Sequence, residues 1–391
     1  MSRILIATLL FFACCLCLSV PAQSAEEKEV GVFADKVVVG TSVPLSGPAA
    51  LWGMTAKGME AYFKFVNDQG EVNGRKIELI IRDDAYNPTK AVANIRELSD
   101  KVFTFAGLLG TAVVQAVRDI VAEKKIPVVF AYGDVRMWVD YPKEKLRYFF
   151  ISYPDYADEG EFLAKFAVEK LGAKKIAVFY QNDSYGKGGL EGVKRFGKVA
   201  VAVPHEVTDT DFFVHAQKIK ESGADTLILY TVPRTAPMIL KELAKIGVRP
   251  KVLSSFTLAD PVMFKLAGDL WEGVYVAGMG IKLPGVDPEG DRIIEILAKY
   301  EPKVKDAPNM AMYGANTGMV FVEALKRTGK DITREKFIEA MESLKNFSTE
   351  LLAPLTFSPQ RRHGSNTSGL MKAEKGKYVR IIPYVEFNPL F

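Results

Sequence analysis

Short runs rich in β-branched and aromatic residues alternate with longer amphipathic stretches along most of the chain. Several of these runs are almost continuously apolar, which is typical of parallel strands that helices cover on both faces. The runs fall into two series, with a break near residues 152–154. The first series is 36–41, 77–82, 102–107, 126–130 and 148–152, and the second is 175–180, 226–230, 251–255 and 273–278.

Helical periodicity fills the gaps between the runs, as in 56–67 and 236–246, where apolar residues recur at three- and four-residue spacing. Asn87 and Pro88 predict the N-cap and first residue of another helix. This order of strands and helices indicates an α/β fold with parallel sheets flanked by helices. After the second series, helices are expected at 289–300, 309–328 and 333–345.

Two series of strands predict two Rossmann-like lobes. Because the chain adds helices after a complete second series, we expect it to return to the first lobe. The predicted N-terminal lobe comprises 36–152 plus 285–350, and the C-terminal lobe comprises 153–284 plus 351–391. Ligands of such sheets bind outside the carboxyl ends of the strands, so a cleft between the lobes is the expected small-molecule site.

Residues 1–25 have the order of a secretory signal peptide: Arg3, an apolar run over 4–20, the helix breaker Pro21 and small residues. The run has about 17 residues, the lower end of the ~17–25 that span a membrane, and no cationic flank follows it. Cleavage and export are favoured over a membrane anchor, and a lipoprotein modified at Cys14 is a third alternative. All three cysteines lie in this run, so the exported chain would work in the periplasm without a disulfide.

The charges argue against polyelectrolyte partners. The chain has 51 Lys and Arg against 47 Asp and Glu, and removal of residues 1–25 takes away only Arg3, leaving 50 against 47. The charges are interspersed, so neither nucleic acid nor an anionic membrane surface is indicated as a partner. We expect a soluble monomer that binds a small molecule.

Enzyme signatures are missing from the sequence. It contains neither a G-x-S-x-G elbow nor a Walker P-loop. Asp83 and Asp84 could be catalytic carboxylates, but successive residues at a strand end point in opposite directions, which favours a turn-forming role. His205, His215 and His363 lack the i, i+4 partner of a zinc site, and we interpret all three as surface residues. No catalytic residue, metal or cofactor is predicted.

Candidate ligand-binding residues gather just past the strand ends. Gly110-Thr111 and Gly133-Asp134 each follow a strand of the first series, where backbone N–H groups and a hydroxyl suit a ligand carboxylate. Any one turn would be ordinary, and any one aromatic residue would belong to the core by default. The coincidence of five aromatic residues at these ends favours a site: Trp52, Tyr132, Tyr156, Tyr185 and Phe256.

Five segments occur in a fixed order: TSVPLSGPAALWG at 41–53, VNGRKI at 72–77, DDAYNP at 83–88, YQNDSYGKG at 180–188 and SGAD at 222–225. Together they resemble type I periplasmic solute-binding proteins, in the branch that includes the leucine/isoleucine/valine-binding protein of ABC importers. The similarity runs from about residue 36 to about residue 357. It implies two lobes that are joined by three crossovers and close on a ligand.

The matching motifs also imply roles for single residues. Trp52 would wall the pocket from the first lobe. Thr111, with the backbone near Gly110 and Gly133, would hold a ligand carboxylate. Two residues would face the ligand from the second lobe: Tyr156 and Tyr185.

The chain departs from the family pattern in the second lobe. Amino-acid-binding relatives hold the ligand ammonium with a Tyr and a Glu, whereas the matching positions here fall on 232–233 and on or near Phe256. A buried ammonium without a carboxylate partner is costly. Asp134 could replace the acid, although it lies on the carboxylate-binding side. Some relatives also have a disulfide between the positions of Tyr86 and Gly110, which cannot form here. A carboxylate with an apolar or aromatic body therefore fits at least as well as an amino acid.

The resemblance thus favours a periplasmic binding protein that delivers a small carboxylate-bearing solute, an amino acid or another organic acid, to an ABC permease of the inner membrane. Two alternatives stay open at this point. One is a periplasmic receptor of the same fold that signals to a membrane sensor. The other is an exported hydrolase that uses Asp83 or Asp134.

Overall fold

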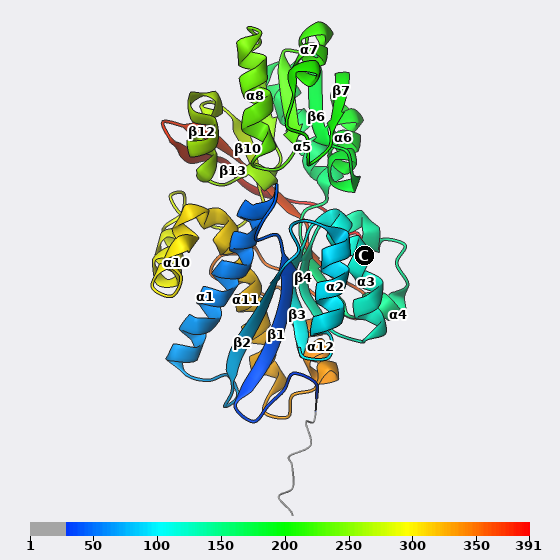
Figure 1. The fold of residues 1–391 in the computed structure, drawn as a ribbon, viewed down its shortest axis with the longest axis vertical. Helices are drawn as coiled ribbons and strands as arrows, with labels where there is room; N and C mark the ends of the chain where they lie inside the picture. The colour runs from blue at the N-terminus through cyan, green and yellow to red at the C-terminus, as the bar shows by residue number, and fades with distance from the viewer. Residues whose placement is uncertain (1–28) are drawn as a thin grey trace, which may run out of the picture.

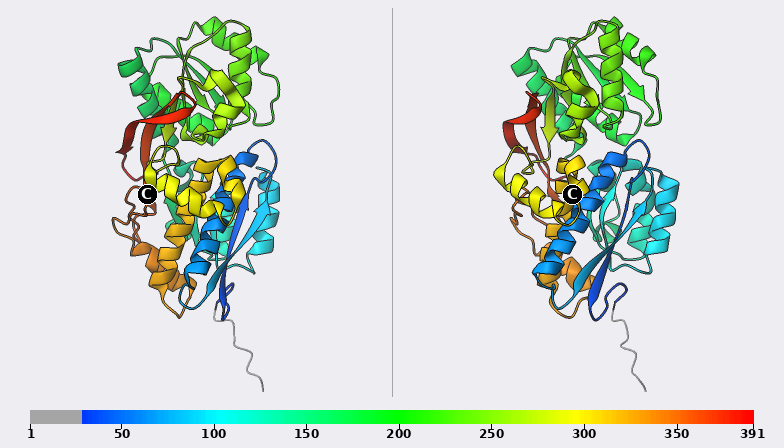
Figure 2. Two further views of the ribbon diagram at one scale, coloured as in Figure 1. Left: turned by 90° about the vertical axis from the view of Figure 1, so that its left-hand side faces the viewer. Right: turned by 60° about the vertical axis from the view of Figure 1, so that its left-hand side comes forward.

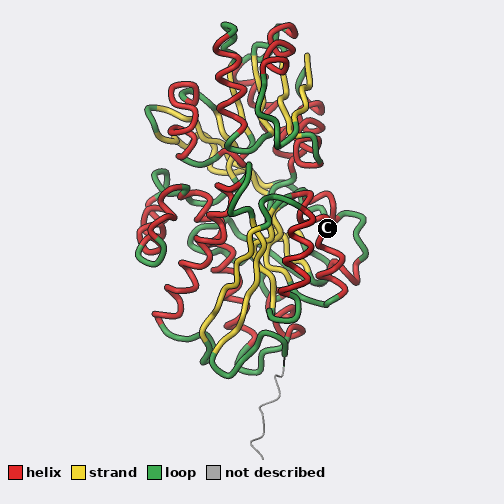
Figure 3. Tube along the Cα trace, in the orientation of Figure 1, coloured by secondary structure: helices red, strands yellow, loops and turns green. Residues whose placement is uncertain are grey.

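The computed structural model describes residues 29–391 and shows two lobes arranged along the long axis of the molecule (Figure 1). The predicted signal peptide lies outside the described residues and stays a prediction. Each lobe places a layer of strands between helices (Figure 3). Within residues 29–391, no helix is both long enough and apolar enough to cross a membrane.

The first lobe is built on a six-stranded sheet of order β11-β5-β4-β3-β1-β2, in which every neighbouring pair is parallel. Its strands are β1 (Lys36–Val43), β2 (Lys76–Asp83), β3 (Thr104–Leu109), β4 (Val128–Tyr132), β5 (Phe149–Ser152) and β11 (His363–Ser365). Its helices are α1 (Met54–Gln69), α2 (Pro88–Leu98), α3 (Thr111–Glu123), α4 (Lys143–Leu146), α10 (Pro288–Ala298), α11 (Pro308–Thr328) and α12 (Arg334–Glu342). α1 and α11 pack together on one face of the sheet, and α2 and α3 pack on the other (Figure 1).

The second lobe is built on a seven-stranded sheet of order β13-β12-β10-β9-β8-β6-β7. The hairpin β12–β13 joins it antiparallel to β10, and the other pairs are parallel. Its strands are β6 (Ile176–Gln181), β7 (Val199–His205), β8 (Thr226–Tyr230), β9 (Lys251–Ser254), β10 (Tyr275–Gly278), β12 (Thr367–Glu374) and β13 (Lys377–Glu386). Its helices are α5 (Tyr156–Leu171), α6 (Ser184–Phe196), α7 (Phe213–Ser222), α8 (Thr235–Lys245) and α9 (Val262–Ala267).

Short 3₁₀ turns connect several of these elements: η1 (Ala50–Gly53), η2 (Val135–Trp138), η3 (Phe256–Leu258), η4 (Gly268–Trp271) and η5 (Pro302–Asp306). The helix ends follow local chemistry. Asn87 caps α2 by accepting the amides of Thr89 and Lys90 at 2.9 and 3.1 Å. Gly172 and Gly223 end α5 and α7 in the left-handed conformation, with φ of 69° and 65°.

Two glycines allow α1 and α11 to approach closely. A Cβ atom at Gly314 would lie 1.7 Å from the carbonyl oxygen of Thr55, and one at Gly58 would lie 2.0 Å from that of Ala311. No side chain fits at either distance. The contact fixes the N-terminal end of α11 beside η1, close to where the two lobes meet.

The chain passes between the two sheets three times: after β5, after β10 and between β11 and β12. The last passage corrects one predicted boundary. Residues 351–391 were expected in the second lobe, but β11 pairs with β5 of the first sheet. The C-terminal tail also returns to the first lobe. The amides of Arg362 and His363, at β11, donate to the carbonyl oxygen of Phe391 at 3.1 and 2.9 Å. The remaining lobe boundaries stay predictions. Figure 2 shows the β12–β13 hairpin and the C-terminus on the same side of the molecule.

The expectation that all three histidines lie at the surface is wrong for two of them. His363 is buried in β11, where its Nε2 donates to the carbonyl oxygen of Tyr153 at 2.8 Å and its Nδ1 accepts the amide of Leu390 at 3.1 Å. Burial lowers the pKa of His363 to about 4. His205 is buried at the end of β7 and stacks on Phe179 at 4.5 Å. Burial also lowers the pKa of His205, so both histidines belong to the core and not to the surface.

One buried carboxylate of the second lobe caps a helix of the first. Asp260 Oδ2 accepts the amides of Asn309 and Met310 at 2.9 and 3.2 Å, where the N-cap residue of α11, Ala307, offers no side-chain acceptor. Asn309 Nδ2 in turn donates to the carbonyl oxygen of Ala259 at 2.7 Å. Asp260 is fully buried, and burial raises its pKa from 3.8 to about 7 against the opposing effect of these amides.

Asp260→Asn should therefore change how stability depends on pH. Since folding raises the pKa of Asp260, its contribution to stability is complete below about pH 4 and is lost as the pH rises toward 7. Asn keeps an acceptor and cannot ionise. Thermal unfolding at pH 5 to 8 should show the melting temperature of Asp260→Asn rising relative to that of the parent as the pH increases. The exposed Asp269→Asn is the matched control, and parallel curves for parent and Asp260→Asn would contradict the assignment.

Candidate functional site

A cavity of about 30 Å³ lies between the lobes, at the carboxyl ends of strands from both sheets. By the same measure, one water molecule needs roughly 10–15 Å³. None of the residues that line the cavity is charged. They are Ala49, Trp52, Tyr86, Leu109, Gly110, Thr111, Tyr132, Tyr153, Tyr156, Tyr185, Val232 and Thr257.

Six of the nine residues predicted from the sequence line this cavity: Trp52, Gly110, Thr111, Tyr132, Tyr156 and Tyr185. The other three, Gly133, Asp134 and Phe256, do not line it but contact residues that do. Sequence reasoning missed Tyr153 and Thr257, which also follow strand ends and could have been found by the same rule. That the nine residues bind a ligand stays a prediction.

Phe256 is the centre of an aromatic cluster that spans the two lobes. It is fully buried and meets Trp52 of the first lobe edge-on, with 6.5 Å between ring centroids. It also meets Tyr153 edge-on at 5.1 Å and stacks on Tyr156 at 6.1 Å. Trp52 itself stacks on Tyr313 of α11 at 5.9 Å. Aromatic contacts of this kind favour burial of apolar area and fix ring orientation.

The first lobe presents the N-terminus of α3 to the cavity. Gly110 is the N-cap residue, with φ of 109° and no side-chain cap. Its amide donates to the carbonyl oxygen of Tyr132 at 2.8 Å and is therefore already bonded within the first lobe. Thr111 Oγ1 accepts the amide of Asp134 at 3.1 Å and keeps its own proton for donation. A Cβ at Gly133 would lie 3.0 Å from Thr111 Cα, so this close approach of two turns needs glycine. The first-turn amides of α3 have no intrahelical acceptor.

Asp134 caps the short helical turn η2 and does not line the cavity. Its carboxylate accepts the amide of Arg136 at 3.0 Å and so caps η2. Burial raises the pKa of Asp134 to about 6. The Arg136 guanidinium pairs instead with the buried Asp155 of the second lobe, at 2.8 Å. Neither charge lines the cavity.

The second lobe presents hydroxyl groups that already have partners. Tyr185 Oη lies 2.6 Å from Thr257 Oγ1 and donates to the carbonyl oxygen of Thr231 at 3.3 Å. Tyr156 Oη lies 3.0 Å from Tyr153 Oη. Val232 completes this wall. The second-lobe side of the cavity is therefore aromatic and apolar, with no acidic group in the lining.

Tyr86 and Gly110 are neighbours in the structure. A Cβ at Gly110 would lie 2.7 Å from Cε2 of Tyr86, so the tyrosine ring takes up the space beside the glycine. From the second lobe, Gln181 and Asp183 lie near the Tyr86 hydroxyl. Tyr86 therefore belongs to the contact between the lobes.

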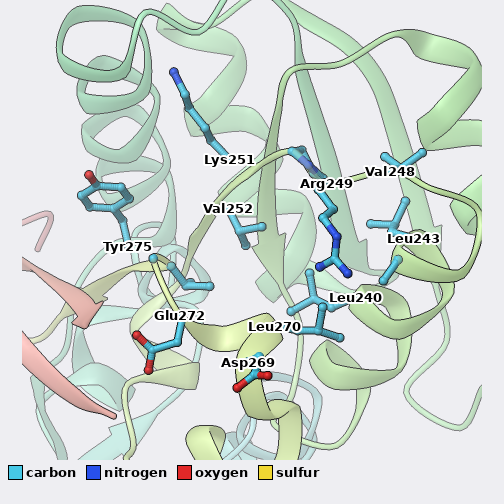
Figure 4. A pocket seen from close by; sticks show the side chains of 14 residues that line it. Leu240, Leu243, Val248, Arg249, Lys251, Val252, Asp269, Leu270, Glu272 and Tyr275 are labelled. Carbon is cyan, nitrogen blue, oxygen red and sulfur yellow. The ribbon is translucent and has the colours of Figure 1, made fainter. Parts of the chain in front are cut away.

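A larger pocket, of about 220 Å³, lies away from this interface. Figure 4 shows Lys251 above the apolar side chains of the pocket, Arg249 extending down among them, and Asp269 and Glu272 below. The pocket opens at the amino ends of β9 and β10, near Lys251 and Tyr275. Because parallel sheets bind ligands at the carboxyl ends of their strands, we take the interlobe cavity as the candidate site.

The model of a protein family described as periplasmic binding protein matches residues 36–377. The chain belongs to this family. It is 25% identical over 356 residues to Leu/Ile/Val-binding protein homolog 3 of Brucella melitensis, covering 89% of this chain and 94% of the relative. It is 23% identical over 318 residues to the leucine-, isoleucine-, valine-, threonine- and alanine-binding protein of Pseudomonas aeruginosa, covering 79% and 83%.

Solved structures of the family share the fold. A fatty acid ABC transporter substrate-binding protein from Thermomonospora curvata superposes with a TM-score of 0.81 at 23% identity, covering 92% of this chain and 95% of that one. A branched chain amino acid ABC transporter protein from Thermus thermophilus with bound valine gives 0.81 at 20% identity, covering 91% and 98%. The predicted type I periplasmic binding protein fold is confirmed.

The family also decides between enzyme and binding protein. The relatives are named as solute-binding proteins and not as enzymes, so the prediction of a protein without catalysis is confirmed. Asp83, one candidate of the hydrolase alternative, forms a turn as expected. Its Oδ1 accepts the amides of Leu45, Ser46 and Ala85 at 2.8, 3.2 and 2.9 Å.

Thr111→Val should weaken the binding of carboxylates by about 1.5–3 kcal/mol, the contribution of a hydrogen bond to a charged group. Valine keeps the shape of the side chain and removes its hydroxyl, which is both the donor to the ligand and the acceptor of the Asp134 amide. Thr111→Ser is the matched control, because serine keeps the hydroxyl and loses only the methyl group. Titration calorimetry with benzoate and with 4-methyl-2-oxopentanoate, the keto acid of leucine, measures the difference. Equal affinities for the Val and Ser variants would show that Thr111 does not hold the carboxylate.

Proposed function

We propose that this protein is the exported substrate-binding component of an ABC importer, and that it captures a small carboxylate-bearing solute and delivers it to a permease of the inner membrane. The observation that carries the proposal is the composition of the interlobe cavity. Its first-lobe side offers a helix N-terminus and a free hydroxyl proton, and its second-lobe side offers aromatic area without a charge.

A carboxylate suits the first-lobe side for two physical reasons. The uncapped first turn of α3 has amides that need acceptors, and the N-terminal end of the helix dipole favours negative charge. Thr111 adds a hydroxyl donor beside them. Relatives named for branched-chain amino acids and for a fatty acid support the same class, because all these solutes combine a carboxylate with an aliphatic body.

The second-lobe side argues against an ammonium group on the solute. A buried cation needs an acidic partner, and the cavity lining contains none. Val232, Tyr156 and Tyr185 instead offer apolar surface, and burial of apolar area of the solute against them contributes about 25 cal/mol per Å² removed from water. An aliphatic or aromatic acid without an α-ammonium therefore matches both sides of the cavity.

Capture by closure of the lobes follows from the size of the cavity. About 30 Å³ accommodates water but not an organic acid of several carbon atoms. A solute therefore enters when the lobes are apart, and the closed form that holds it must open contacts such as Trp52–Phe256 enough to make room for it. The solute stabilises the closed form because it binds that form more tightly than the open form.

The test compares acids that differ in the ammonium group alone. On ligand-stripped protein we expect 4-methyl-2-oxopentanoate and benzoate to bind more tightly than leucine, in calorimetry and in thermal-shift assays. A solute at 100 times its dissociation constant should add roughly 2.7 kcal/mol to the free energy of unfolding. Tighter binding of leucine than of both acids would overturn the proposed solute class.

A further inference from the structure

Glu159 is a fully buried carboxyl group behind the second-lobe side of the cavity. It lies on α5, one turn after Tyr156, so the two side chains share a face of the helix. Its Oε1 accepts the amide of Phe256 at 2.9 Å, while its Oε2 has no hydrogen-bond partner. The carboxyl group thus supports the backbone of the residue that centres the aromatic cluster.

No cation neutralises this carboxyl group, because Glu159 forms no ion pair within residues 29–391. The Arg136 guanidinium pairs with Asp155 instead. The groups that interact with it electrostatically or through hydrogen bonds are neutral or acidic. They are Asp155 at the start of α5, Tyr185 of α6, Tyr230 of β8, the hydroxyl of Ser255, Tyr153 after β5 and Tyr313 of α11.

An isolated buried carboxylate is costly, so burial favours the neutral acid. Burial raises the pKa of Glu159 to about 7, although the Phe256 amide and nearby hydroxyls oppose the change. The group therefore changes its charge near neutral pH, directly behind a wall that has no charge of its own.

We propose that Glu159 selects the charge of the solute: as a neutral acid it permits an anion in the cavity, and as a carboxylate it repels one. Capture of an anion is then coupled to uptake of one proton from the solvent, which forms an O–H bond at the unpartnered Oε2. This inference rests on the proposed function, because it concerns the carboxylate solute of the same cavity.

Three other buried acids could take up a proton instead. Asp84 accepts the hydroxyl of Ser42 in the turn after β2, and burial raises its pKa to about 6; Glu159→Gln would leave its effect in place. Asp134 lies beside Thr111, and Asp260 caps α11 across the lobe interface. An effect of Asp260 would follow lobe closure and would be the same for charged and uncharged solutes. Comparison of an anion with its neutral isostere therefore separates Glu159 from Asp260, and Asp134→Asn separates it from Asp134.

The experiment measures the affinities of benzoate and benzamide by calorimetry at pH 6, 7 and 8. Coupling to one proton can change an affinity by at most about tenfold per pH unit. For the parent, the preference for benzoate over benzamide should fall several-fold from pH 6 to pH 8. Glu159→Gln should abolish this fall, while Asp134→Asn should retain it. The control Glu161→Gln, which removes a half-exposed carboxylate from the same helix, should behave as the parent.

Three results would overturn the inference while the proposed function stands: a preference that is constant with pH in the parent, a Glu159→Gln variant that behaves as the parent, or loss of the effect in Asp134→Asn alone. If Glu159→Gln does not fold, or if benzamide does not bind, benzoate titrations of the parent in two buffers of different ionisation enthalpy count the protons directly. No uptake at pH 7.5 overturns the inference. Failure of both benzoate and 4-methyl-2-oxopentanoate to bind at any pH overturns the proposed solute class as well.

Discussion

The packing of Phe256 against aromatic residues of both lobes is the interaction on which the rest of the site depends. Its ring contacts Trp52 from the first lobe and Tyr153 and Tyr156 from the second-lobe side. Its amide is held by the buried carboxyl group of Glu159. The residues that line the cavity beside this ring include no acid, so the cavity wall has no counter-charge for a cation.

The buried acidic groups around the cavity therefore lie behind the residues that line it, and not in the lining itself. Asp134, Glu159 and Asp260 are buried, and burial raises the pKa of each toward neutrality. Their amide partners lie in η2, η3 and α11, so the acids position the elements that surround the cavity. In the proposed function, a helix N-terminus, a hydroxyl and aromatic area recognise the solute, a combination that suits one negative end and an apolar body.

Local patterns were enough to predict most of the fold. Continuous apolar runs predicted the central strands β3, β4 and β8, because both faces of these strands are covered. Asn87 with Pro88 predicted the start of α2. Other features depend on contacts far apart in sequence and leave no local signal. The pairing of His363–Ser365 with β5, and the burial of His205 and Glu159, are of this kind. The edge strand β7 was not among the predicted runs; it contains Pro204, which an edge strand tolerates.

The same distinction applies to the candidate site. The positions of the predicted strand ends were enough to select five of the residues that line the cavity, because a residue that follows a parallel strand lies at the carboxyl edge of the sheet. They are Trp52, Thr111, Tyr132, Tyr156 and Tyr185. The amide of Gly110 could not be assigned from sequence, because its acceptor, the carbonyl oxygen of Tyr132, belongs to another strand.

The central claim is that solutes bind between the lobes against Trp52. It is tested most directly by titration of Trp52→Ala and Trp52→Phe with the more tightly bound of the two acids, with thermal unfolding as a check on the fold. Loss of the indole should weaken binding by about 2 kcal/mol or more, roughly 30-fold, as for a buried aromatic anchor, and Phe should restore part of it. An alanine variant that is folded and binds as tightly as the parent would contradict the account.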